Sequence, residues 1–163
     1  MSDKTITERL QPSLLDRLTD NDPGQKTERR DDRIIDIRGL RDIIQRDLVW
    51  LLNTSNNRID PDRYPNAANS TLNFGIREVA GDYSTAERAE MIRKSIATAI
   101  RTFEPRIFHG SVDVQLRLGE EERETIVTYD IRADMWAQPL PLELYLRSQV
   151  DVTTGELNLE RVG

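Results

Sequence analysis

The sequence has no cysteine and a single histidine, His109. Without cysteine there can be no disulfide, no thiol catalysis and no zinc site built on thiolates. One histidine leaves too few of the usual ligands for a zinc site of a common type. Neither a G-x-S-x-G nucleophile motif nor a phosphate-binding glycine loop is present. We therefore expect no cofactor, no bound metal and no catalytic residue, and we assign His109 a structural or surface role.

Long apolar runs are also missing. No stretch approaches the length of a membrane span, and residues 1–13 (MSDKTITERLQPS) contain no apolar core of signal-peptide length. The formal net charge is -6 at pH 7, which opposes bulk attraction to nucleic acid or to an anionic membrane surface. We expect a cytoplasmic protein that binds no nucleic acid and does not insert into the membrane.

What the sequence does contain is abundant charge, 32% of residues, with apolar residues in regular patterns. Residues 1–33 read as an N-terminal segment, with a short amphipathic helix over 13–18 and a charged linker that includes a turn signal at 22–24. Residues 34–163 are long enough to form one domain with a hydrophobic core.

Two segments of that domain repeat apolar residues every three or four positions, the period of a helix with one buried face. The first runs from about residue 36 to 52 and the second from about 84 to 104. A capping box of Ser84 and Glu87 opens the second helix, and Pro105 ends it, because proline disfavours the α conformation at the preceding residue. The expected buried faces are Ile37, Leu40, Ile43, Ile44, Leu48, Leu51 and Leu52, and Ala89, Ile92, Ile96, Ala99, Ile100 and Phe103.

Residues 53–84 lack a sustained period, and Pro61 and Pro65 exclude a long helix there. We expect irregular structure in which the apolar stretch 72–76 packs on the domain and Gly75 is free to take positive φ.

Beyond residue 111 the period falls to two. Residues 112–118 and 127–133 alternate apolar and polar side chains and predict an antiparallel hairpin, with further strands near 142–152 and 156–161. Ser148 is the one polar residue on the apolar parity of the third strand. Helices come first and a small, mainly antiparallel sheet of three to four strands comes last, so the fold class is α+β rather than a wound parallel sheet.

The junction between the second helix and the first strand reads FEPRIFHG, residues 103–110. Glu104 is unfavourable there, because a helix C-terminus carries partial negative charge. A cation, either Arg106 or a group on a partner, must therefore neutralise its carboxylate. Pro105 stiffens the junction, and both side chains would project with little entropy left to lose on binding. The residues alone favour an internal salt bridge, worth little if exposed, over a docking element.

Several short stretches occur in the order found in a known family. They are residues 13–18 (SLLDRL), 46–48 (RDL), 51–54 (LLNT), 64–65 (YP), 72–76 (LNFGI) and 103–106 (FEPR). On these stretches the chain resembles the TssE family of type VI secretion baseplate subunits and the related baseplate wedge proteins of contractile phage tails, an IraD-like fold family. Phe74 stands where the family usually has tyrosine, so no hydrogen-bonding role is carried over to it.

The resemblance implies a structural subunit of an assembly and not an enzyme. Such a subunit joins a wedge of TssF and TssG, within a baseplate that also holds TssK and the VgrG spike, at the inner face of the cytoplasmic membrane. The TssB–TssC sheath grows from that platform. The resemblance also implies that Glu104, Pro105 and Arg106 dock on the helical core of TssF–TssG, which reverses the preference for an internal pair. We expect Arg106→Ala to leave the fold intact and weaken docking by roughly 2 to 5 kcal/mol.

Two further expectations concern binding surfaces. Leu14, Leu15 and Leu18 form an apolar face that could dock on a partner or, equally, on the chain's own domain. One of the strands near 142–152 and 156–161 could be a sheet edge that accepts a strand from the first sheath subunit.

Two other functions remain as alternatives. A peptidoglycan hydrolase would use Glu104 as an acid, but the sequence identifies no second carboxylate to complete the pair that such an enzyme needs. A free regulatory adaptor of the same fold would form a one-to-one complex with a signalling protein in place of a large assembly.

Overall fold

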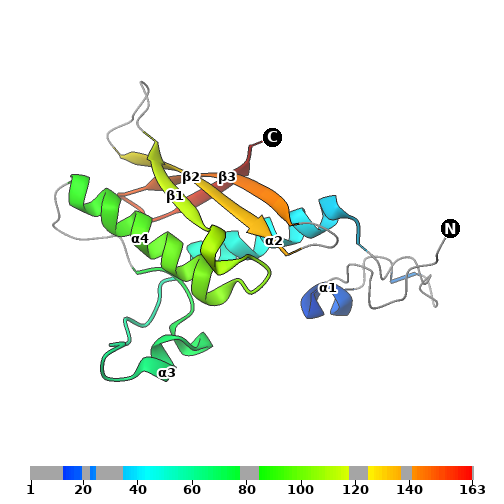
Figure 1. The fold of residues 1–163 in the computed structure, drawn as a ribbon, viewed down its shortest axis with the longest axis horizontal. Helices are drawn as coiled ribbons and strands as arrows, with labels where there is room; N and C mark the ends of the chain where they lie inside the picture. The colour runs from blue at the N-terminus through cyan, green and yellow to red at the C-terminus, as the bar shows by residue number, and fades with distance from the viewer. Residues whose placement is uncertain are drawn as a thin grey trace.

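The computed structural model describes residues 13–19, 23–24, 35–77, 85–117, 125–136 and 141–162. Figure 1 shows the helices and strands in chain order. The helices are α1 (Leu14–Leu18), α2 (Ile37–Leu52), α3 (Pro65–Ala68) and α4 (Thr85–Phe103), with short 3-10 turns η3 (Thr71–Asn73) and η4 (His109–Ser111). The strands are β1 (Asp113–Arg117), β2 (Ile126–Met135), β3 (Leu142–Asp151) and β4 (Leu157–Arg161).

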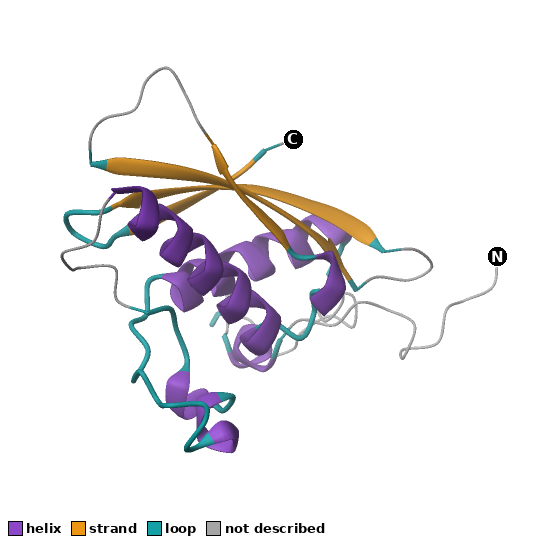
Figure 2. Ribbon diagram, turned by 60° about the vertical axis from the view of Figure 1, so that its left-hand side comes forward, coloured by secondary structure: helices purple, strands orange, loops and turns teal. Residues whose placement is uncertain are grey.

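The four strands form one antiparallel sheet in the order β1-β2-β3-β4, which confirms the α+β class. The long helices gather on one face of the sheet, as Figure 2 shows, with α4 packed under β1 and α2 under β4. The other face is polar because side chains alternate along each strand. Strands β1 and β4 stand first and last in the strand order, so they are the two edges of the described sheet, and β3 lies inside it.

Helix α2 begins close to residue 36, where the sequence predicts. Its first turn is capped by the side chain of Asp36, which accepts the N–H of Gly39 at 2.7 Å. Its buried face consists of Leu40, Ile44, Leu48, Leu51 and Leu52. Ile37, in the first turn, was expected on that face but is 44% exposed.

Helix α4 buries Ala89, Ile92, Ile96, Ala99 and Ile100 as expected, together with Ala97. Its predicted N-cap, Ser84, lies outside the described residues. Strand β2 is joined to this helix by the fully buried Tyr129, whose phenol donates to the carbonyl of Ala89 at 2.9 Å.

Between α2 and α4 the chain leaves the body as a loop that carries α3 and η3 (Figure 1). The loop returns at Gly75, whose φ is +118°, a conformation that the sequence analysis left open to this glycine. Two backbone bonds of 2.8 Å join Ile76 to Thr54 and Asn56 there. Ile76 is buried and Phe74 packs against the core beside Phe103, as expected, but Leu72 is 66% exposed, so the start of the apolar stretch is left uncovered.

In β3 the side chain of Ser148 points to the buried face, as its place on the apolar parity predicts. This residue is fully buried beside Leu146 and Val150, and its hydroxyl has no hydrogen-bond partner in the described chain. No helix among the described residues has both the length and the apolar character needed to cross a membrane.

Candidate functional site

The junction between α4 and β1 is a short elbow, residues 104–108, fastened to the end of β2. Glu104 closes the last helical turn through its N–H to Ile100, and Pro105 then turns the chain away. Ile107 bridges to Met135, and both side chains are buried. The elbow is therefore fixed by the core beneath it and not only by the proline ring.

Glu104 points into the protein and is 4% exposed. Its carboxylate accepts the backbone N–H of Arg106 at 3.0 Å and the Nε and Nη2 groups of the same arginine at 2.7 and 2.5 Å. The expectation that both side chains project from the elbow is thus wrong for Glu104. The internal pair that the residues alone favoured is present, and both carboxylate oxygens are engaged by it.

Arg106 continues the pairing into α2. Its Nη2 also donates to Asp47 at 2.7 Å, and Asp47 accepts from Arg46 at 2.7 Å as well. Arg46 in turn pairs with Asp16 of α1. Asp16, Arg46, Asp47, Arg106 and Glu104 thus form a charge ladder that joins three segments far apart in the sequence.

The ladder shifts the pKa of three of its members, Arg106, Arg46 and Asp16. Burial alone would lower the pKa of Arg106, but the hydrogen bonds that it donates to Glu104 and Asp47 outweigh burial and raise that pKa. The hydrogen bond with Asp16 raises the pKa of Arg46, and the same bond lowers the pKa of Asp16 below 3.8. Three carboxylates face two guanidinium groups, so the ladder carries one surplus negative charge.

One part of Arg106 remains unused. Its Nε and Nη2 groups are committed to Glu104 and Asp47, whereas Nη1 meets no acceptor among the described residues. The side chain is 28% exposed. Two N–H donors therefore sit at the surface on a guanidinium that is already held in place, an arrangement suited to a fixed oxygen acceptor on another molecule.

Helix α1 is held by charge and not by its apolar face. Leu14, Leu15 and Leu18 are 71%, 48% and 74% exposed, while Asp16 between them bonds to Arg46. The part of the chain that the structure describes therefore leaves these leucines uncovered, although the sequence left docking on the own domain open.

Sequence reasoning missed the members of the site that come from α2. Arg46 and Asp47 were noted only for the family resemblance, and Trp50, which is half exposed and lies under Arg46 at 5.0 Å, was not noted at all. Trp136 was also missed. It is 56% exposed, and its backbone N–H donates to the carbonyl of Arg106 at 2.7 Å, so an exposed aromatic residue is joined to the elbow.

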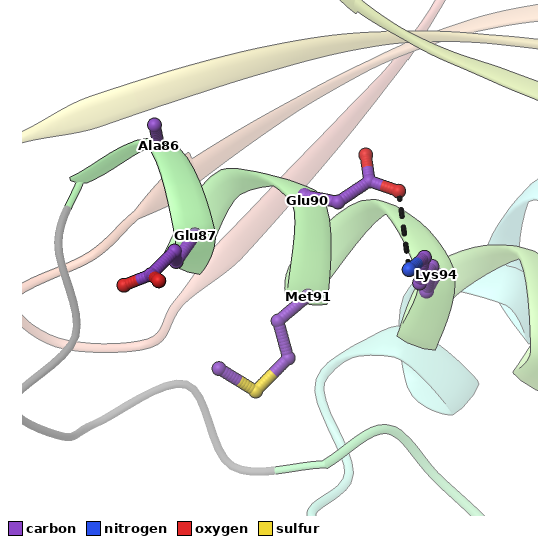
Figure 3. Close-up of a pocket in the computed structure, with 5 residues that line it drawn as sticks. All are labelled: Ala86, Glu87, Glu90, Met91 and Lys94. Carbon is purple, nitrogen blue, oxygen red and sulfur yellow. Dashed lines mark ion pairs between the residues drawn. The ribbon is translucent and has the colours of Figure 1, made fainter.

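Elsewhere in the described part of the chain, the features that could hold a ligand are weaker. A hollow of about 480 Å³ lies along α4 and is lined by Ala86, Glu87, Glu90, Met91 and Lys94 (Figure 3). All five belong to one helix. The hydrogen bond from Arg93 lowers the pKa of Glu90 to about 2, which leaves that carboxylate unsuited to donate a proton. His109 is exposed on η4, and the described residues contain no cluster of metal-ligating side chains.

The comparisons with known proteins agree with an assembly role. Searches of curated proteins and of solved structures give no match. The family model described as baseplate wedge protein gp25 matches residues 38–140, well over half of the chain, including α2, α4, the elbow and both strands of the first hairpin. The chain belongs to the baseplate wedge protein gp25 family, which is also the family of TssE.

Proposed function

We propose that this protein is a structural baseplate subunit of a type VI secretion system and docks on the TssF–TssG wedge through its elbow. The observation that carries the proposal is the Nη1 of Arg106, which meets no acceptor among the described residues, on a partly exposed side chain whose guanidinium is already fixed by Glu104 and Asp47. A group that is preorganised in this way loses little side-chain entropy when a partner binds.

The charge balance indicates what that partner offers. Because the ladder already carries one surplus negative charge, a further carboxylate would be repelled by Asp47 and Glu104. Neutral carbonyl oxygens fit better, and those left free at the end of a helix also carry partial negative charge. A helical core such as that of TssF–TssG provides acceptors of this kind.

Two apolar features extend the same surface. Trp136 flanks the elbow, and the exposed leucines of α1 lie beyond Arg46 at the far end of the ladder. Exposed aromatic and apolar side chains beside a fixed arginine are typical of the centre of a binding surface. We therefore place Leu14, Leu15 and Leu18 in a second contact with the wedge.

A second part of the proposal concerns the TssB–TssC sheath. Strand β4 is an edge of the described sheet, whereas β3 is paired on both sides. An edge strand can take a strand from another chain, so β4 is the element that would receive the first sheath subunit. Contacts with TssK and VgrG, and assembly at the inner face of the cytoplasmic membrane, complete the proposal.

The docking proposal is tested by pull-down of purified TssF–TssG with the wild-type chain and with Arg106→Ala. Arg132→Ala serves as the control, because Arg132 is exposed on the opposite face of the sheet over Tyr145. Circular dichroism at the assay temperature establishes that each variant is folded. We expect Arg106→Ala alone to lose the wedge, and equal recovery of both folded variants would remove the proposal.

A further inference from the structure

The edge of β4 is not bare. Asp151 donates its N–H to Glu156, and Val162 donates to Tyr145, so the even-numbered residues of β4 bond to β3. In an antiparallel pair the hydrogen-bonding groups alternate, and the backbone of Leu157 and Leu159 therefore points away from β3, toward the position that a fifth strand would occupy.

Asn53, at the C-terminal end of α2, occupies that position at Leu157. Its Nδ2 donates to the carbonyl of Leu157 at 2.8 Å, and its Oδ1 accepts the N–H of the same residue at 2.9 Å. A side-chain amide that both donates to and accepts from one residue makes the bonds that a residue of a neighbouring strand would make. The same Nδ2 also donates to Val49, which ties the amide to α2.

At Leu159, one strand repeat further on, the N–H donates to Oδ1 of the adjacent Asn158 at 3.1 Å, and Gln45 covers only the carbonyl. The Nε2 of Gln45 donates to the carbonyl of Leu159 at 3.0 Å. Both amides come from one helix, two turns apart, so α2 presents a pair of peptide-like groups to successive outward-facing residues of β4.

The opposite edge is covered in a different way. Arg93 and Arg101 of α4 donate to the carbonyls of Val114 and Val112 at 3.3 and 2.7 Å. These are charged donors that meet carbonyls alone, and charged side chains are a common means of blocking an edge. On β4 the caps are neutral amides, and Asn53 reproduces both bonds of a neighbouring strand residue.

We propose that Asn53 and Gln45 are displaceable caps that close the β4 edge in the free chain, and that a sheath strand binds by displacing them at Leu157 and Leu159. This inference rests on the proposed sheath contact. The exchange is nearly balanced in hydrogen bonds, because the incoming backbone replaces the amides. Asn53 is already exposed, so its released amide can be hydrated, whereas Leu157 and Leu159 keep buried side chains that hold the strand in place.

The caps are tested first in the free chain by amide hydrogen exchange of Leu157. Asn53→Ala removes the acceptor of that N–H, and we expect exchange about tenfold faster. Asn53→Asp keeps the acceptor and should retain most of the protection. Gln149→Ala, an exposed change on β3, is the control. Equal protection of Leu157 in the folded Asn53→Ala variant and the wild type would overturn the inference.

Binding of purified TssB–TssC then tests displacement. We expect the double variant Asn53→Ala, Gln45→Ala to bind about tenfold more tightly than the wild type, with Leu157 protected again in the complex. If the wild type binds and the double variant binds with the same affinity, the proposal that the two amides are caps is overturned, while the proposed sheath contact remains. Absence of binding by every chain, the uncapped variant included, would overturn the sheath contact itself, and the caps with it.

Discussion

Arg106 and Glu104 lie two residues apart around a proline, and the arginine meets both oxygens of the buried carboxylate through bonds of 2.7 and 2.5 Å. The pair resolves the unfavourable position of an acid at a helix C-terminus. It also fixes the guanidinium before any partner arrives, so the internal salt bridge and the docking element are two uses of one arrangement.

Removing the arginine should cost stability as well as binding. Arg106→Ala leaves Glu104, which is 4% exposed, with only a backbone N–H to oppose its charge. We expect the free energy of unfolding to fall by about 1 to 3 kcal/mol, since a buried group loses its partner. Urea denaturation measures this, with Arg132→Ala as the control. Equal urea midpoints for Arg106→Ala and Arg132→Ala would contradict a stabilising role for the pair with Glu104. They would agree with the expectation from the sequence that Arg106→Ala leaves the fold intact.

Helix α1 should detach from α2 in acid. The bond to Arg46 holds the pKa of Asp16 below 3.8, so the unfolded or detached segment binds a proton more readily than the docked one. The docked form is therefore favoured fully above about pH 4 and loses that advantage as the pH falls through the lowered pKa. The amide signal of Arg17 in NMR spectra should shift over that acid range, and Asp16→Asn should remove the shift. A persistent shift in Asp16→Asn would assign the change to another group.

Gly75 should tolerate no side chain. A Cβ at this position would lie 2.1 Å from the carbonyl oxygen of Thr54, and the φ of +118° is one that other residues rarely adopt. We expect Gly75→Ala to lower the free energy of unfolding by about 2 kcal/mol or more. Gly110→Ala is the matched control, because a Cβ there meets nothing within 4 Å. Thermal unfolding of the two variants should separate them, and similar midpoints would contradict the tight return of the loop.

Two serines should respond to alanine with opposite signs. Ser148 buries a hydroxyl that has no partner in the described chain, so Ser148→Ala should raise the free energy of unfolding by up to about 1 kcal/mol. Ser111 accepts the N–H of Asp134 and donates to Phe108, both at 2.8 Å, so Ser111→Ala should lower it by about 1 kcal/mol. Chemical denaturation gives both values. Destabilisation by Ser148→Ala would show that the hydroxyl is satisfied after all.

Local patterns predicted the elements well, because the period of apolar residues reflects which face of a helix or strand is buried. The bounds of α2 and α4, the antiparallel hairpin and the parity of Ser148 follow from this. The charge ladder does not, since Asp47 and Arg106 are 59 residues apart and neither carries a periodic signal. The bond between Asn53 and Leu157 spans 104 residues. Such contacts depend on how α2 lies against the elbow and the sheet edge, which no local pattern determines.

The central claim is that the guanidinium of Arg106, held by Glu104 and Asp47, presents its remaining Nη1 group to the wedge. The most direct test is the dissociation constant for TssF–TssG, measured by titration calorimetry, of the wild type, Arg106→Lys and Arg147→Lys. Lysine keeps the charge beside Glu104, but its single ammonium group cannot pair with Glu104 and Asp47 and still hold a separate donor toward the wedge. Arg147 pairs with Asp130 on the other face of the sheet. We predict that Arg106→Lys weakens binding at least about tenfold while Arg147→Lys binds as the wild type does. Equal affinities for all three would contradict the account.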